Sequence, residues 1–115
     1  MPSSAPPGLT PAGDTLVESV PDVRQDTPRM WRVLLHNDDF TTQDFVVWVL
    51  ETVFTKTAAD AYTIMLHVHH AGLGVAGIYT KDVAESKVAA TERLAEQHEF
   101  PLRVSMEPEP EEAHR

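Results

Sequence analysis

Three adjacent polar residues, Asn37, Asp38 and Asp39, stand at a position where side chains of their type can hold a ligand. They follow a hydrophobic segment over residues 31–36 and precede the expected start of a helix near Phe40. Amide and carboxylate oxygens at such a position either cap the helix or accept hydrogen bonds from a ligand. From these three residues alone, both interpretations stay open.

A second group of chemically active residues is the histidine-rich segment over residues 65–70, which is predicted to be helical and can bring a ring nitrogen to the same place. On a helix, His67 and His70 lie one turn apart, while His69 points elsewhere. Metal-binding pairs usually lie at i and i+4 and need a third ligand, which a residue such as His36 could supply only if the fold brought it near. The competing interpretation, histidines on a solvated helix face, is favoured for His67 and His70.

Two amphipathic helices are expected to carry these groups. The first has apolar residues at helical period, at Phe45, Val46, Val49, Leu50, Val53 and Phe54. Thr41 and Asp44 fit a capping box at its start. The second helix begins after Thr57 and stops at Gly72. Its apolar face is made of Ala61, Ile64, Met65 and Val68.

The remaining segments predict two strands and a third helix. Residues 75–79 are typical of a short strand, and Thr80 is the predicted N-cap of the following helix. One side of that helix holds Ala84, Val88, Thr91 and Ala95. Residues 102–106 alternate between apolar and polar, the period of a half-exposed strand. The predicted fold class is α/β, as a two-layer α+β domain of order β-α-α-β-α-β with three helices packed on a small three-stranded sheet.

The segment over residues 72–77 matches the G-x-G-x-x-G pattern of dinucleotide-binding loops letter for letter. That loop must follow a strand and open a helix, so that the helix N-terminus meets the pyrophosphate. Here the glycines leave a helix and enter a strand. We therefore expect a helix stop and a tight turn instead of a nucleotide site.

Charge and composition exclude several classes of function. The net charge is −9, and residues 30–106 hold six Lys or Arg against ten Asp or Glu. No basic face is available to release counterions from a phosphate backbone, so nucleic-acid binding is not expected. The acidity suits cationic partners such as peptide ammonium groups. The chain has no cysteine, which excludes disulfides, thiolate zinc sites and cysteine nucleophiles.

Composition also divides the chain into three parts. Six of the nine prolines lie within residues 1–28, which hold few large apolar residues and are predicted to be a disordered N-terminal extension. Residues 107–115 are predicted to be an acidic disordered tail, which leaves 29–106 as one folded domain. No targeting segment and no apolar run of about 20 residues is found, so we expect a soluble, cytoplasmic monomer without membrane association.

Three segments, LLHNDDFTTQDFVVWVL, IMLHVHHAG and IYTKDVAESKVA, resemble the ClpS family of proteolytic adaptors. The resemblance covers residues 30–106 without a gap. It implies the fold that ClpS shares with the C-terminal domain of the ribosomal stalk protein. It also implies a non-enzymatic adaptor without a cofactor, which binds the destabilising N-terminal residue of a substrate protein or peptide and delivers the substrate to a Clp AAA+ unfoldase of the ClpA or ClpC type.

The resemblance assigns roles to particular residues. Asn37, Asp39 and His69, with Asp38 beside them, would contact the substrate's α-amino group. That group is mostly an ammonium at neutral pH, and an amide oxygen, a carboxylate and a neutral imidazole supply three acceptors for its protons. The slot for a first side chain of the Leu, Phe, Tyr or Trp type would be lined by Thr41, Gln43, Val46, Met65, Val68 and Leu102. Gln43 departs from the family pattern, in which many members have a Met that closes over the pocket and excludes β-branched side chains.

The resemblance further implies that Asp82, Glu85 and Lys87, near the start of the third predicted helix, contact the N-terminal domain of the unfoldase. Residues 1–28 resemble the family's N-terminal extension, which the unfoldase engages during delivery.

Two other functions stay open at this point. One is a protein-interaction module of the same fold, in which the pocket is ordinary core. The other is an acid–base enzyme that uses Asp38, Asp39 and His69, although it lacks a nucleophile in a recognisable setting, a cofactor loop and a metal triad.

Overall fold

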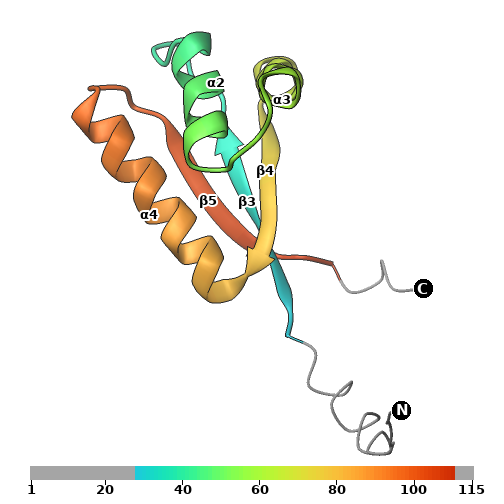
Figure 1. Cartoon of the computed structure of the whole chain (residues 1–115). Coiled ribbons are helices and arrows are strands. Elements are labelled where there is room, and N and C mark those ends of the chain that lie inside the picture. Colours follow the sequence, from blue (N-terminus) through green and yellow to red (C-terminus); the bar gives the residue numbers. More distant parts are fainter. Residues whose placement is uncertain (1–27, 111–115) are drawn as a thin grey trace, which may run out of the picture.

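The computed structural model describes residues 28–110 and contains the predicted order of strands and helices (Figure 1). The elements are β3 (Met30–His36), α2 (Gln43–Thr52), α3 (Ala58–Ala71), β4 (Leu73–Thr80), α4 (Lys81–Gln97) and β5 (Arg103–Pro108). The predicted α+β fold of three helices and a three-stranded sheet is therefore confirmed. No helix among the described residues is long and apolar enough to cross a membrane.

The sheet is antiparallel, and its middle strand is β3. The strand order is β4-β3-β5, so the first and last strands of the described chain lie side by side, with Leu35 opposite Val104. On its other side, β3 pairs with β4 through a register shift after Val33, which leaves Ala76 as the extra residue of a β-bulge. The strand that ends at the Asn-Asp-Asp segment is thus held by backbone hydrogen bonds on both sides.

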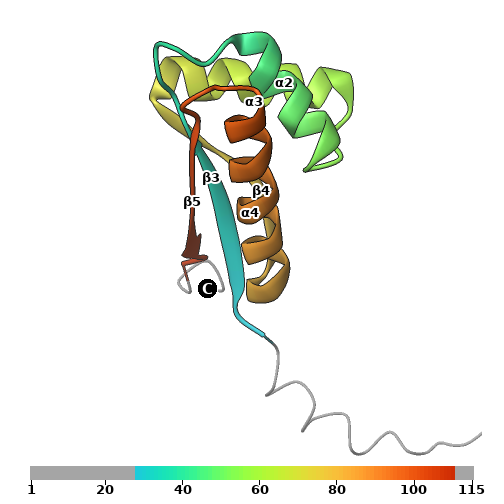
Figure 2. The same cartoon turned by 90° about the vertical axis from the view of Figure 1, so that its left-hand side faces the viewer.

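The helices bury one face of this sheet. α4 contacts all three strands, while α2 and α3 pack together at one end of the molecule (Figures 1 and 2). Because side chains alternate along a strand, Val33 and Leu35 of β3 both point into the core, and both are 0% exposed. Val49 and Leu50 of α2 belong to the same buried cluster. The sheet and α2 therefore share one hydrophobic core.

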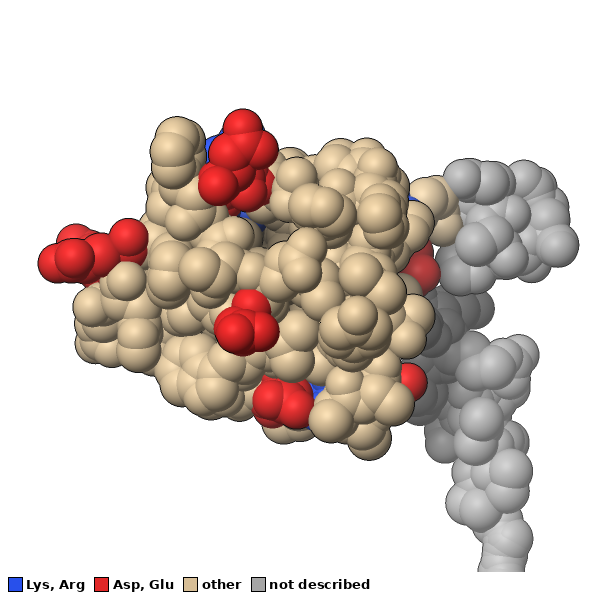
Figure 3. Space-filling model, turned by 90° about the horizontal axis from the view of Figure 1, so that it is seen from above, with Lys and Arg blue, Asp and Glu red and all other residues tan. Residues whose placement is uncertain are grey.

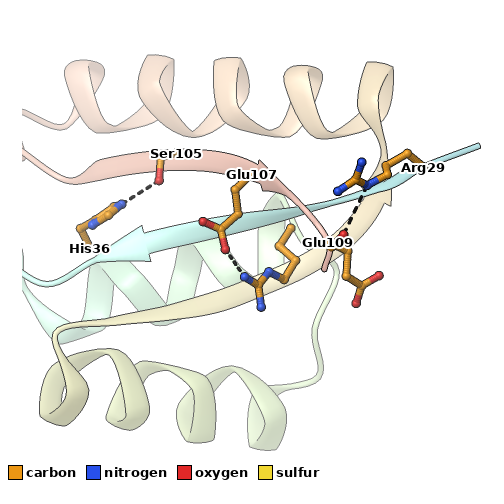
Figure 4. Close-up of polar contacts among 6 residues, drawn as sticks. Arg29, His36, Ser105, Glu107 and Glu109 are labelled. Atoms are coloured by element: carbon orange, nitrogen blue, oxygen red, sulfur yellow. Dashed lines mark hydrogen bonds and ion pairs between the residues drawn. The ribbon is translucent and has the colours of Figure 1, made fainter. Parts of the chain in front are cut away.

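The opposite face of the sheet carries polar pairs between β3 and β5 (Figure 4). Arg32 forms an ion pair with Glu107, and His36 Nε2 lies 2.8 Å from Ser105 Oγ. These side chains are partly exposed. The two-layer arrangement thus leaves one face of the sheet to solvent, as the alternating pattern of β5 predicts.

The folded part of the chain reaches further than predicted at its C-terminal end. β5 continues to Pro108. Beyond it, the Glu109 N–H donates to the carbonyl of Met30 at 2.8 Å, and the Glu109 carbonyl accepts from Arg29 Nε at 3.3 Å (Figure 4). The predicted tail boundary at residue 107 is therefore too early, because β3 offers backbone partners to these residues. Residues 1–27 and 111–115, with the rest of the predicted extension and tail, lie outside the described residues.

The start of α2 also differs from the prediction. Thr42 is the N-cap, and its Oγ1 accepts from the Phe45 N–H at 3.1 Å. The predicted capping box of Thr41 with Asp44 does not form, because the Thr41 hydroxyl donates to Asp38 Oδ2 at 2.7 Å instead. The helix therefore begins one residue later than the capping-box pattern suggested.

The starts of α3 and α4 lie where they were predicted. Thr57 Oγ1 accepts from the Asp60 N–H at 3.1 Å. Thr80 occupies the N-cap of α4, but its side chain makes no capping hydrogen bond. The three threonine caps thus differ in whether the hydroxyl satisfies a free N–H of the helix.

The three glycines within residues 72–77 have structural roles. Gly72 ends α3 as predicted, with a φ of 96° that suits glycine. The other two, Gly74 and Gly77, lie within β4, so the predicted tight turn between helix and strand is made by Gly72 alone. A Cβ on Gly74 would come within 2.9 Å of the His67 side chain, and one on Gly77 within 2.2 Å of the Tyr79 hydroxyl oxygen. Each glycine therefore leaves room for a neighbouring side chain.

We predict that Leu35→Ala lowers the free energy of unfolding by about 2–5 kcal/mol, because it removes buried methyl groups and leaves a cavity. Ile78→Ala is the matched control, since Ile78 lies on the neighbouring strand and is 43% exposed. Its cost should stay below about 1 kcal/mol. Urea unfolding followed by circular dichroism measures both, and equal costs would contradict the one-sided burial of the sheet.

A second prediction concerns the helix caps. Thr42→Ala should lower the free energy of unfolding by about 1 kcal/mol, because the N–H of Phe45 loses its acceptor. Thr80→Ala should cost less, because the Thr80 hydroxyl caps no N–H. Thermal unfolding of the two variants compares the caps directly, and a larger loss for Thr80→Ala would disprove this assignment.

Candidate functional site

The turn between β3 and α2 begins with a contact to a distant part of the chain. The N–H of Asn37 donates to the carbonyl of Gly72 at 2.9 Å. Because Gly72 is the C-cap of α3, this bond places the end of β3 beside the last turn of α3. His69 belongs to that last turn. Two segments far apart in the sequence therefore meet at one place.

Asp38 holds the middle of the same turn. Its Oδ1 accepts from the N–H groups of Phe40 at 2.7 Å and Thr41 at 2.8 Å. Its Oδ2 accepts from the Thr41 hydroxyl at 2.7 Å. The sequence left open whether the polar triplet caps a turn or binds a ligand, and for Asp38 the structure shows the capping contacts.

The other two members of the triplet differ from Asp38. Within the described part of the chain, the side chains of Asn37 and Asp39 make no hydrogen bond or ion pair, and both residues are exposed. Their oxygens are therefore available as acceptors. His69 is also exposed, and its ring contacts the ring of His70 at a centroid distance of 5.2 Å.

The two helices supply apolar walls below these acceptors. Val46 of α2 and Met65 and Val68 of α3 are all buried. Val68 and His69 lie three and four residues after Met65, so both are its neighbours on the surface of α3. Gln43 stands at the first position of α2 and is exposed.

Together these residues enclose a pocket of 170 Å³. It is lined by Asn37, Asp38, Asp39, Thr41, Gln43, Val46, Met65, Val68 and His69. For comparison, an engineered apolar cavity of about 150 Å³ in another protein takes up benzene. The space is thus large enough for one aliphatic or aromatic side chain, with polar acceptors at one end and an apolar floor.

All nine lining residues were named as site residues from the sequence. Leu102, the tenth, does not line this pocket. It precedes β5, is 7% exposed and belongs to the hydrophobic core. The pocket lining therefore does not include the contact expected from the sequence between Leu102 and a bound side chain.

The remaining histidines of the segment lie outside the pocket. His67 and His70 are exposed on α3. Among the described residues, no group of three or more histidine, aspartate or glutamate side chains could hold a metal ion. The solvated-face interpretation of these two histidines agrees with their exposure.

One neighbour of the pocket was not singled out in the sequence. Phe40 is 78% exposed and stands between Asp39 and Thr41, which both line the pocket. A single exposed aromatic side chain is ordinary on a protein surface, so only its place beside the acceptors sets Phe40 apart. In the sequence, Phe40 follows the polar triplet directly, and this position indicated only the start of a helix.

The charge around this end of the molecule is mainly negative. Figure 3 looks down on the end where α2 and α3 lie, and Asp and Glu cover far more of the visible surface than Lys and Arg. The surface therefore favours a positively charged ligand group over an anion.

A larger groove lies near the other end of α2, against α4. Its volume is 620 Å³, and it is lined by Thr52, Val53, Asp82, Val83, Ser86, Lys87, Ala90, Arg93 and Leu94. Asp82 and Lys87, but not Glu85, are among these residues. Lys87 also has a structural contact, because its Nζ donates to the carbonyl of Val53 at 2.7 Å. The polar acceptors of the turn belong to the smaller pocket, so we take that pocket as the ligand site.

Comparisons with known proteins identify the family of this chain. Residues 26–105 match the family model of the ATP-dependent Clp protease adaptor protein ClpS. The ATP-dependent Clp protease adapter protein ClpS of Myxococcus xanthus is 53% identical over 94 residues, which cover 82% of this chain and 88% of that protein. Its counterpart in Deinococcus radiodurans is 51% identical over 106 residues, covering 92% and 93%.

A solved structure is also similar. Agrobacterium tumefaciens ClpS2 bound to L-phenylalaninamide matches with a TM-score of 0.69 and 34% sequence identity, covering 71% of this chain and 99% of that one. The matched residues include the turn after β3 and the helices α2 and α3, which together supply the pocket residues. Since that match spans more than half of the chain, and both relatives are identical to it at over half of the aligned positions, the chain belongs to the ClpS family of ATP-dependent Clp protease adaptors.

Proposed function

We propose that this protein is a non-enzymatic cytoplasmic adaptor, which binds the free N-terminal residue of a substrate protein and delivers that protein to a Clp AAA+ unfoldase. The observation that carries the proposal is the 170 Å³ pocket with acceptors at one end and apolar walls below them. L-phenylalaninamide, the molecule bound to the Agrobacterium relative, has a free α-amino group and one aromatic side chain. These two groups match the two ends of the pocket.

The polar end is suited to an ammonium group. An α-amino group has a pKa of about 7.7–8.0 in peptides, so it is mostly protonated at neutral pH and offers three N–H donors. Asn37 and Asp39 supply unengaged oxygens, and His69 supplies a ring nitrogen on the facing helix. Acetylation removes the charge and two of the three donors, so an acetylated terminus would leave acceptors unpaired.

The apolar end determines which first residues are bound. Val46, Met65 and Val68 are buried and line the pocket. Burying one large apolar side chain there contributes roughly 1.5–3 kcal/mol, and each charge-assisted hydrogen bond adds about 1.5–3 kcal/mol. With three such bonds and an association cost of at least about 4 kcal/mol, about 2–8 kcal/mol remain, and the upper end of that range corresponds to micromolar binding. Affinity of this order suits an adaptor that must release its cargo.

We also propose a contact surface for the unfoldase. Asp82 and Glu85 are exposed near the start of α4, and Asp82 borders the 620 Å³ groove. We assign these two carboxylates, together with Lys87, to contacts with the N-terminal domain of a ClpA- or ClpC-type unfoldase. The groove and the peptide pocket involve opposite ends of α2, so both partners can be bound at once.

The first prediction from this proposal concerns the free N-terminus. A labelled peptide that begins with Leu or Phe should bind with about micromolar affinity, and N-acetyl-Leu should lose at least about tenfold, because the acceptors are left without donors. Fluorescence anisotropy measures both. Equal binding of the free and acetylated peptides, or no binding by the folded protein, would refute the proposed function.

Gln43 is expected to set the tolerance for β-branched first residues. Gln43→Met should increase the preference for Leu over Val by about tenfold, because an apolar side chain then closes over the slot. Gln97→Met is the matched control, since it adds the same side chain at the exposed end of α4. Competition binding with Leu and Val peptides gives the ratio, and an unchanged ratio would exclude Gln43 as the gate.

The unfoldase surface gives a separate prediction. Asp82→Lys and Glu85→Lys should each weaken binding to an isolated unfoldase N-terminal domain by about tenfold, because the charge at the contact is reversed. Peptide affinity should not change. Glu96→Lys makes the same change near the far end of α4 and serves as the control. Calorimetry with a ClpA-type and a ClpC-type domain also identifies the partner type, and loss only in the Glu96 variant would overturn the assignment.

A further inference from the structure

The carboxylate of Asp38 is engaged within its own turn, and this distinguishes it from its two neighbours. It accepts three hydrogen bonds of 2.7–2.8 Å, from the N–H groups of Phe40 and Thr41 and from the Thr41 hydroxyl. A carboxylate offers about four acceptor positions. Most of the acceptor capacity of Asp38 is therefore used before any ligand arrives.

The same three bonds fix the turn in which the free acceptors stand. Asn37 and Asp39 flank Asp38 directly, so the backbone that Asp38 holds also sets the direction of their side chains. The turn is fixed at its start by the bond from the Asn37 N–H to Gly72, and at its end by the Thr42 cap of α2. Asp38 supplies the contacts between these two points.

We propose that Asp38 is a positioning residue, which holds the turn so that Asn37 and Asp39 face the ammonium group, and that it is not itself the carboxylate that binds this group. The inference rests on the proposed function. It divides two adjacent aspartates into different roles: Asp39 provides the negative charge at the ligand, and Asp38 provides the geometry.

The charge environment agrees with this division. The Asp38 carboxylate faces two backbone N–H groups, whose partial positive charges offset its own. No Lys or Arg lines the pocket. The Asp39 carboxylate makes no hydrogen bond or ion pair within residues 28–110, so its full charge is available to an approaching cation.

Amide substitutions at the two positions separate the roles. Asp38→Asn keeps Oδ1 as the acceptor for both N–H groups, and its new NH₂ can donate to the Thr41 oxygen. We expect its affinity for a free Leu peptide to stay within about threefold of the native value. Asp39→Asn removes the charge that pairs with the ammonium and should lose at least about tenfold.

Asp38→Ala provides the opposite test. It removes all three hydrogen bonds of the turn, so we expect peptide affinity to fall by at least about tenfold. Hydrogen exchange measured by NMR should show faster exchange at the amides of Phe40 and Thr41, while amides in the core of β3 stay protected. The Asn variant should restore both the protection and the binding.

The inference is overturned if Asp38→Asn loses as much affinity as Asp39→Asn while the Phe40 and Thr41 amides stay protected, because the Asp38 charge itself would then be binding the ligand. It is also overturned if Asp38→Ala binds as the native chain does. If the native protein binds no free Leu peptide, the proposed function fails instead, and the exchange data still decide whether Asp38 holds the turn.

Discussion

The central position of β3 is the constraint on which the rest of the structure depends. Both edges of this strand are hydrogen-bonded, to β4 and to β5, and its core-facing side chains are fully buried. A strand fixed in this way has little freedom at its end. The chain therefore leaves β3 at a defined point. The hydrogen bond from the Asn37 N–H to the Gly72 carbonyl then fixes the backbone for one further residue. The polar turn thus follows the strand that is paired on both sides, which suits a site whose acceptors must be arranged in advance.

The pocket combines two kinds of surface that elsewhere in the domain are kept apart. Its walls come from the hydrophobic interface between α2 and α3, and its rim comes from the turn after β3. An apolar cavity alone would bind any small hydrophobic group, and exposed oxygens alone would bind any cation weakly. Their combination requires both an ammonium group and a large side chain on the same atom, as at the start of a peptide. A site of this kind distinguishes an N-terminal residue from the same residue inside a chain.

The helix α2 connects the peptide pocket with the larger groove. Gln43 and Val46, near its start, line the pocket, while Thr52, its last residue, lines the groove. A helix of 10 residues is about 15 Å long, so the pocket and the groove lie at separate ends of α2. The bond from Lys87 to the Val53 carbonyl fixes the C-terminal end of α2 to α4. Under the proposed function, this separation lets the chain hold a substrate at one end of α2 and a partner at the other.

The sequence by itself determined the order of elements, the apolar faces of the helices and the segments that carry the site, because hydrophobic period, threonine caps and Gly72 are local signals. It could not determine that β3 lies between β4 and β5, that β5 runs on to Pro108, or that Leu102 lies in the core beside the pocket residues, since strand pairing depends on contacts between distant residues. The polar triplet shows the division most clearly. All three side chains carry acceptor oxygens, so residue type alone does not say which of them bonds within the turn. The tertiary structure, in which Asp38 accepts from Phe40 and Thr41 while its neighbours make no such bond, decided this.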